Sequence, residues 1–378
     1  MRSIANIYIM LTFFVYIISC SVIFMIVKDI IYKKNDKKVE KLNNTFGKEI
    51  LRQLNELKHN RSISKMDIDY VKDKLKSSIY SRVFINAISE FNKLDKGNKK
   101  ITRVYVYNFE EIINKDLKKY RKKDDTLKSY IAVVLGEYGI SNYEISEFLF
   151  NNLRSKSIYL RVASLKSLAK IGNRSNLIKG LIYISENNKY INNNILVDII
   201  DQFDGDDNLL NQGLFNSFNE FSENIQKSII DNLKNNRTTS EKEKLLILLK
   251  DNITPKEVKI SIIKYFEFIK YEKAEIEIIN LLKSNDWEYR AICARALGTY
   301  NSENSKIELM KSIKDGNWYV RYNTAMSILK FKDKNIIYEL LESNDKYARD
   351  IIFYALFMNN KISYDEYIER KREVESVC

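Results

Sequence analysis

Arg290-Ala-Ile-Cys-Ala-Arg-Ala-Leu297-Gly298 is the clearest copy of a phrase that recurs eight times in this chain of 378 residues. A polar or charged head is followed seven residues later by an apolar anchor, and successive heads lie 28 to 33 residues apart. The head and anchor pairs are Lys128/Leu135, Arg161/Leu168, Asn193/Ile200, Gln226/Leu233, Lys259/Phe266, Arg290/Leu297, Arg321/Ile328 and Arg349/Leu356. Such a period is typical of a solenoid, whose units cannot bury their apolar faces alone and must stack. The phrase therefore predicts a binding surface rather than a catalytic pocket.

The composition favours helices throughout. One proline and ten glycines are far fewer than average, and both residue types interrupt regular elements. Helix starts are visible as Thr254-Pro255-Lys256-Glu257 and as three capping boxes, which begin at Ser141, Ser240 and Ser363. We therefore expect an all-α protein, a right-handed α-solenoid of helix pairs that is preceded by one N-terminal transmembrane helix.

The N-terminus contains an uncharged stretch from Ile4 to Val27, followed by the charged pair Lys28-Asp29. Its 24 residues would span about 36 Å as a helix, which is enough to cross a bilayer with some tilt. We interpret residues 1–27 as a transmembrane anchor. A cleaved signal peptide fits less well because no small-residue cleavage site follows, and a lipoprotein signal ending at Cys20 is a weaker alternative.

Flanking charge predicts the orientation of this anchor. Arg2 alone precedes the apolar stretch, whereas six lysines follow it, namely Lys28, Lys33, Lys34, Lys37, Lys38 and Lys41. The positive side of a membrane helix stays in the cytoplasm. We therefore expect a single-pass protein of the cell membrane with a cytoplasmic solenoid.

Five segments follow from these patterns. Residues 1–27 are the anchor, 28–60 a basic juxtamembrane helix, and 61–125 an irregular helical cap outside the repeat frame. The solenoid covers 126–360, and 361–378 form a charged C-terminal helix. Two apolar stripes predict the core of the first part, and they comprise Val39, Leu42, Phe46, Ile50 and Leu54, then Val83, Phe84, Ala87, Ile88 and Phe91.

The best repeat copies resemble a known family. Asp286-Trp-Glu-Tyr-Arg290-Ala-Ile-Cys-Ala-Arg-Ala-Leu-Gly and Gly316-Asn-Trp-Tyr-Val-Arg321-Tyr-Asn-Thr-Ala look like HEAT repeats. The likeness covers about 126–359 and fades between Asn193 and Lys259, where the head arginine is missing. An anchor, a basic linker and HEAT units in this order resemble membrane-anchored bacterial HEAT-repeat proteins. That resemblance implies a scaffold or adaptor, in some relatives one that supports surface polysaccharide synthesis beside a membrane glycosyltransferase.

Three groups of residues are candidate sites. Arg161, Arg290, Arg321 and Arg349 could form an anion-binding ladder, but in HEAT proteins this arginine is structural, and we expect it to bond a turn such as those of Asp286 or Asp315. Trp287 and Trp318 occupy equivalent positions and either pack between units or form an aromatic patch for a partner. The basic residues of 93–123, especially Lys118, Lys119, Arg121, Lys122 and Lys123, could contact an acidic partner.

Catalytic signatures are missing from the sequence. His59 is the only histidine, so the chain offers few candidate ligands for a zinc site, which needs three or four. Cys20, Cys293 and Cys378 lie far apart without metal-ligand spacing, and no phosphate-binding or nucleophile-elbow motif occurs. We expect no enzyme activity, cofactor or metal, although some HEAT-like families are enzymes.

The leading hypothesis is a membrane-tethered scaffold that binds an unknown protein partner through the solenoid. We expect specific binding in two places, the divergent stretch from Asn193 to Lys259 and the basic cap before Thr126. The alternative is an anionic surface or nucleic acid bound by Lys93–Lys123, which predicts steep loss of affinity with salt. Of these two ligands, a membrane tether favours the anionic surface over nucleic acid.

Overall fold

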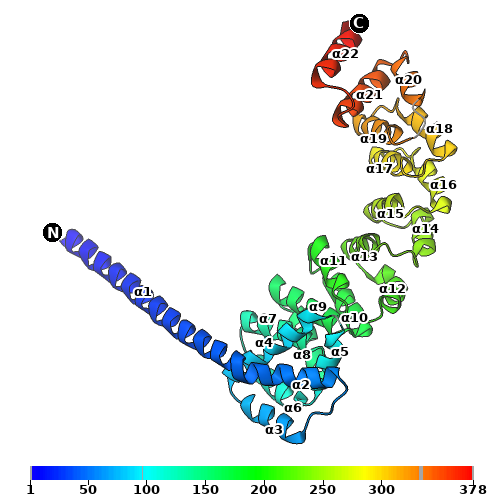
Figure 1. Cartoon of the computed structure of the whole chain (residues 1–378). Helices are drawn as coiled ribbons and strands as arrows, with labels where there is room; N and C mark the ends of the chain where they lie inside the picture. Colours follow the sequence, from blue (N-terminus) through cyan, green and yellow to red (C-terminus); the bar gives the residue numbers. More distant parts are fainter. Residues whose placement is uncertain (1, 96, 332–334, 377–378) are drawn as a thin grey trace. The chain divides into compact units, whose positions relative to one another are not determined.

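The computed structural model describes residues 2–95, 97–331 and 335–376, and the side chains of 2–9, 32, 370, 371 and 373–376 lie outside this description, as does Cys378. Every regular element in these ranges is a helix, so the all-α prediction is confirmed for this part of the chain (Figure 1). The chain divides into two compact units, Met1–Gly180 (unit 1) and Leu181–Cys378 (unit 2).

Unit 1 begins with a long helix and a compact group of shorter ones. Its elements are α1 (Arg2–Leu42), the π-helical turn η1 (Asn43–Gly47), α2 (Lys48–Lys58), α3 (Lys65–Lys74), α4 (Ser78–Leu94), α5 (Asn98–Tyr107), α6 (Glu110–Tyr120), α7 (Asp125–Tyr138), α8 (Tyr143–Leu153) and α9 (Ile158–Ile171). Helix α10 (Arg174–Glu186) spans the boundary between the units.

Helix α1 is long and apolar enough to cross a membrane by length and composition. The side chains of residues 10–31 are all exposed, so unit 1 offers them no core. Beyond Asn35 the same helix enters the body of the unit, where Val39 is buried. The predicted limit at residue 27 therefore lies inside one continuous helix.

The two predicted apolar stripes form the core of unit 1. Val39, Phe46, Ile50 and Leu54 are buried, and Leu42 is half-buried. All five predicted residues of α4, from Val83 to Phe91, are buried as well. The aromatic rings of Phe84, Tyr105 and Phe109 pack together between α4 and α5, with centroids 5.2 to 6.0 Å apart.

Unit 2 is a series of helix pairs. Its elements are α11 (Asn193–Asp201), α12 (Asp207–Asn216), the short 3₁₀ helix η2 (Phe218–Glu220), α13 (Glu223–Asn235), α14 (Lys242–Lys250), α15 (Lys256–Phe268), α16 (Glu272–Leu281), α17 (Trp287–Leu297), α18 (Glu303–Ser312), α19 (Trp318–Ile328), α20 (Asn335–Leu341), α21 (Lys346–Met358) and α22 (Tyr364–Ser376). In unit 2, α11, α13, α15, α17, α19 and α21 follow one another along one side, and the intervening even-numbered helices line the other (Figure 1).

All eight copies of the repeat phrase lie on odd-numbered helices, from α7 to α21. Seven of the eight anchors are buried, and the last, Leu356, is half-buried at the end of the series. Seven of the eight apolar anchors are thus covered by packing, as the period predicts. The helix-pair architecture is confirmed by these packing positions.

Small residues set the closest approach between successive repeat helices. A Cβ added to Gly298, at the end of α17, would lie 2.9 Å from the Cα of Ser327 on α19. Gly136 and Ser167 hold the equivalent positions on α7 and α9, with a corresponding distance of 3.1 Å. In both pairs a glycine follows the anchor and a serine precedes the next one, so at these two contacts the small residues of the phrase determine the helix spacing.

The helix starts differ in part from the prediction. Ser363 and Glu366 form the expected reciprocal box, with bonds of 2.6 and 3.2 Å between backbone N–H and side chain. The box at Ser141 is wrong, because Asn142 caps α8 instead. The capping box predicted at Ser240 is also wrong, because α14 begins without a side-chain cap. The N-cap predicted at Thr254 is wrong as well: Pro255 occupies the N-cap position of α15, and the Thr254 hydroxyl donates to Asp251.

Asparagine occupies several left-handed turn positions at which glycine is more usual. Asn60, Asn188, Asn301 and Asn360 have positive φ between 48° and 57°, a conformation that asparagine tolerates better than most residues. Left-handed glycines end only α7 and α9 among the described helices. This substitution explains how so many helices are connected with so few glycines.

Candidate functional site

The four head arginines share one geometry. Each donates from Nη1 to a backbone carbonyl six residues earlier, at 2.6 to 2.9 Å. The carbonyls belong to the turn that precedes the arginine's own helix, where peptide oxygens are left unpaired by the ending helix. Arg161, Arg290 and Arg321 also reach the carbonyl five residues earlier. The structural role of these arginines is confirmed, and they clamp turns rather than present an anion-binding ladder.

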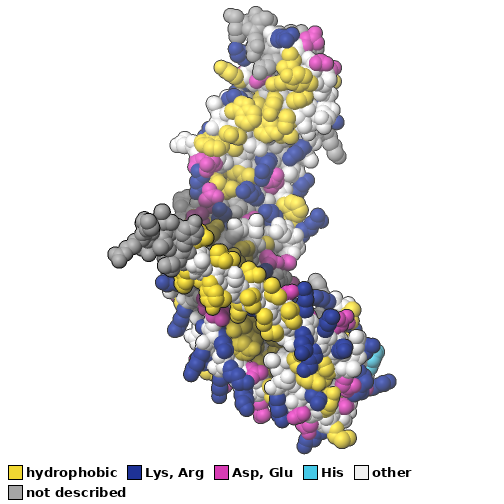
Figure 2. Space-filling view, turned by 90° about the vertical axis from the view of Figure 1, so that its left-hand side faces the viewer, with side chains coloured by type: hydrophobic (Ala, Val, Ile, Leu, Met, Phe, Trp, Pro, Cys, Tyr) yellow, Lys and Arg dark blue, Asp and Glu magenta, His cyan; other side chains and the backbone are white. Residues whose placement is uncertain are grey.

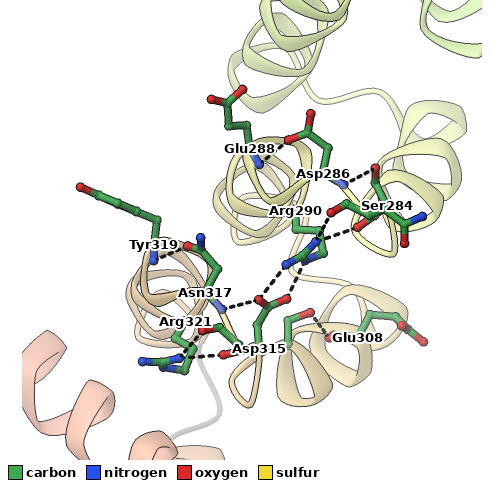
Figure 3. A network of polar contacts seen from close by, with 12 residues as sticks. Ser284, Asp286, Glu288, Arg290, Glu308, Asp315, Asn317, Tyr319 and Arg321 are labelled. Carbon is green, nitrogen blue, oxygen red and sulfur yellow. Dashed lines mark hydrogen bonds and ion pairs between the residues drawn. The ribbon is translucent and has the colours of Figure 1, made fainter.

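Among the ion pairs of the described residues, Arg290 is the one head arginine that also reaches the next repeat. Its Nε and Nη2 atoms lie 2.7 and 3.0 Å from the two carboxylate oxygens of Asp315 (Figure 3). Burial by itself would raise the pKa of Asp315, but hydrogen bonds from Arg290 and from the Asn317 N–H outweigh it and hold the pKa below 3.8. The expected partner Asp286 pairs instead with Lys256, at 2.5 Å.

Trp287 and Trp318 both pack between repeats and remain exposed. The Trp287 ring stacks on Tyr319 at 5.4 Å, and the Trp318 ring lies parallel to Tyr322 at 5.1 Å. Tyr354 on α21 approaches both Trp318 and Tyr322, at 5.9 and 5.8 Å. We call these five residues the aromatic ladder, which crosses α17, α19 and α21.

The aromatic ladder is open to solvent. Trp287, Trp318 and Tyr319 are 40%, 43% and 56% exposed. A hydrophobic patch covers this part of unit 2 in the upper half of Figure 2. Exposed aromatic clusters recur at protein interaction sites in general, and tryptophan and tyrosine are among the residues most enriched at the energetic centres of interfaces. The sequence indicated the two tryptophans but not the tyrosines that connect them.

The ladder ends against the C-terminal helix. Tyr367 of α22 lies 6.1 Å from Tyr354 and stacks on Phe357 at 5.3 Å. Helix α22 therefore covers the last rung of the aromatic surface and leaves the part on α17 and α19 open.

The basic residues of the predicted cap lie on and after α6. Lys118, Lys119, Arg121, Lys122 and Lys123 are all exposed. Lys119 pairs with Asp116 at 2.7 Å and Arg121 with Glu147 at 2.5 Å, so acidic neighbours balance two of the five charges. These residues belong to unit 1, and the two tryptophans belong to unit 2.

Lys119 and Lys123 lie on the wall of a groove that the sequence did not indicate. It has a volume of about 960 Å³ and is lined by α1, α4, α6 and α7. Most of the lining is isoleucine, leucine, tyrosine and phenylalanine. The sequence did not indicate this groove because its lining residues come from helices that are separated along the chain.

The divergent stretch around Asn193 contains a smaller polar groove of about 510 Å³ between α11 and α13. Asp231 in its wall accepts from Asn193 at 3.0 Å and from Lys234 at 2.9 Å, and Asp201 accepts from Asn236 at 3.0 Å. These carboxylates are matched by local donors. Among the described residues no three of His, Cys, Asp and Glu are grouped to hold a metal ion.

Comparison with known proteins bears on the C-terminal repeats. Residues 275–356 match the family model of HEAT repeats. Human deoxyhypusine hydroxylase in complex with glycerol aligns over 79% of this chain and 97% of its own, at 13% identity and a TM-score of 0.28. An engineered protein aligns over 65% of this chain and 94% of its own, at 17% identity and a TM-score of 0.19.

TM-scores this low carry no conclusion about activity. No curated protein matches the chain. The matched span includes the copies at Arg290, Arg321 and Arg349, which also share the arginine clamp and the aromatic ladder. Residues 275–356 of this chain are thus similar to HEAT repeats, and the helix pairs before them follow the same frame of head and buried anchor.

Proposed function

We propose that this protein is a membrane-tethered scaffold without catalytic activity, whose right-handed solenoid binds a partner protein in the cytoplasm. The observation that carries the proposal is the aromatic ladder on α17, α19 and α21. Its rings are held in place by stacking on one another, so a partner can bury them with little further loss of side-chain freedom.

The tether is supported by α1. Its exposed apolar side chains between residues 10 and 31 have no cover within unit 1, and a bilayer would provide one. The six lysines that follow favour a cytoplasmic position for both units. A tether of this kind raises the effective concentration of the scaffold for partners in the same membrane.

The ladder favours a protein partner over nucleic acid. Acidic side chains accompany it: Glu288 and Asp286 lie beside Trp287, where both pair with Lys256. Nucleic acid would require an excess of basic side chains around the stacking rings. The resemblance to membrane-anchored bacterial HEAT proteins makes a membrane glycosyltransferase of surface polysaccharide synthesis the first partner to test.

The test is affinity capture from solubilised membranes with three forms of the full chain. Trp318→Ala removes the central ring of the ladder, and Tyr338→Ala removes a 65% exposed ring of α20 outside it. We expect a membrane protein that the wild type and Tyr338→Ala capture and that Trp318→Ala loses. Equal capture by all three forms, with unchanged circular dichroism, would exclude the ladder as the binding surface.

The anchor has its own test. Removal of residues 1–27 should release a soluble fragment that still captures the same partner. A C-terminal reporter that is active only outside the cytoplasm should stay silent, and its activity would reverse the proposed orientation.

A further inference from the structure

The apolar groove of unit 1 lies beside the point where α1 leaves its exposed apolar stretch. Asn35 and Val39 of α1 form part of its wall, and the apolar stretch ends at Val27. Asn35 follows Val27 by eight residues along the helix, a rise of about 12 Å. The headgroup layer adds roughly 5 to 7 Å on each side of the hydrocarbon core. If α1 crosses a bilayer and Val27 lies at the edge of the hydrocarbon core, Asn35 therefore lies about 5 to 7 Å beyond the headgroups, and the groove opens next to the membrane surface.

The interior of the groove is suited to hydrocarbon. Ile79 and Ile85 of α4, Ile112 and Ile113 of α6, and Ile131 of α7 line it, and all five are half-buried. Side chains of this type normally complete their burial against another apolar group. A volume of about 960 Å³ lies at the upper end of the range for small-molecule sites, roughly 300 to 1,000 Å³.

The charges of the wall are predominantly positive. Lys76, Arg82, Lys119 and Lys123 line the groove, against Asp116 as its one acidic lining residue. Arg82 pairs with Asp36 at 3.0 Å, Lys76 with Asp73 at 2.8 Å and Lys119 with Asp116 at 2.7 Å. All four basic side chains are exposed to solvent. In the lower half of Figure 2, recessed hydrophobic side chains lie below α1, with Lys and Arg side chains around them.

We propose that this groove binds an anionic phospholipid of the same membrane, with an acyl chain against the isoleucines and the phosphate near Lys119 and Lys123. An apolar interior with a basic rim matches the two ends of such a lipid, and a peptide would not require both next to a membrane helix. The inference rests on the proposed membrane tether. It gives the basic residues after α6 a role at the membrane surface instead of nucleic-acid binding.

The experiment reconstitutes the full chain into phosphatidylcholine vesicles that contain a photoreactive phospholipid with a diazirine in its acyl chain. One set of vesicles uses a phosphatidylglycerol probe and the other a phosphatidylcholine probe. Labelled peptides are then mapped by mass spectrometry. We expect the phosphatidylglycerol probe to label peptides of α4 and α6, and both probes to label residues 10–27 of α1, which serve as the internal reference.

Two neighbouring lysines provide the matched variants. Lys123 lines the groove, whereas Lys122 is equally exposed but does not. We expect Lys123→Glu to reduce labelling of α4 and α6 roughly fivefold relative to α1, and Lys122→Glu to leave the ratio unchanged. Labelling confined to α1, equal groove labelling by the two probes, or an equal effect of both variants would overturn the proposal.

Carbonate extraction of the same vesicles separately tests whether α1 anchors the chain in the membrane. A chain that resists extraction but shows no label in α4 and α6 contradicts the lipid groove and leaves the scaffold proposal intact. A chain that is extracted contradicts the anchor, and the label in α4 and α6 still decides the groove.

Discussion

Arg290 and Asp315, which are 25 residues apart, join two successive repeats through a bidentate ion pair, while the same arginine holds the carbonyls of Ser284 and Asn285 in the turn before its helix. The two side chains are only 20% and 13% exposed. The Arg290 guanidinium thus holds the turn before α17 and also sets the distance to the turn before α19, which contains Asp315. We therefore regard it as the main polar link between α17 and α19.

Replacement of Asp315 should therefore weaken this part of the protein. We expect Asp315→Asn to lower the free energy of unfolding by about 2 kcal/mol, because a charged hydrogen-bonded partner of Arg290 is lost. Urea unfolding followed by tryptophan fluorescence measures this directly, since Trp287 and Trp318 are the two tryptophans of the chain. Asp345→Asn is the control: asparagine caps a helix as well as aspartate does, so a change within about 0.5 kcal/mol is expected.

The same pair makes stability depend on pH. The pKa of Asp315 is lower in the folded protein than its ordinary value of 3.8. A carboxyl group with a lowered folded pKa contributes stability that is complete above its unfolded pKa and is lost as the pH falls through the folded value. The wild type should thus lose its advantage over Asp315→Asn below about pH 4. A constant difference between the two proteins from pH 6 to pH 3 would contradict this assignment.

Gly298 should not tolerate a side chain. Alanine would place its Cβ 2.9 Å from the backbone of Ser327, and relief of that overlap requires α17 and α19 to separate. Overpacking of this kind costs about 1–3 kcal/mol, which exceeds the gain of about 1 kcal/mol from the better helix propensity of alanine. We expect a lower midpoint of thermal unfolding for Gly298→Ala.

Gly316 provides the comparison for that measurement. No atom lies within 4 Å of a Cβ added at Gly316, so Gly316→Ala should unfold at nearly the wild-type temperature. If both variants melt together, the close contact with Ser327 does not limit the spacing of these helices.

Cys293 should report the opening of the last repeats. Its side chain is fully buried on α17, and burial raises the pKa of its thiol well above the ordinary value. Both effects suppress the thiolate that reacts with alkylating reagents. In a protein with Cys20→Ser and Cys378→Ser, we expect no labelling in the folded state and rapid labelling in the urea range where tryptophan fluorescence changes. Fast labelling without denaturant would show that α17 opens locally.

The sequence by itself determined the repeating architecture. Each copy of the phrase brings its own apolar anchor, and four copies also bring an arginine clamp. Both features act within one repeat or between adjacent repeats. Periodicity is therefore enough to predict helix pairs, their stacking and the buried positions from Leu135 to Ile328. The helix starts were less accurate, because Asn142 and Ser141 are equally good caps and local geometry decides between them.

Only the tertiary structure decided what the surfaces are. The aromatic ladder depends on the stacking of Trp287 on Tyr319 from the next repeat, and the repeat period does not specify which exposed rings will meet. The apolar groove gathers isoleucines from α4, α6 and α7, whose separation along the chain leaves no local pattern. A repeat is encoded by contacts between neighbours in sequence. A binding surface arises instead where distant segments pack together. The two differ because packing geometry is decided only in the folded chain.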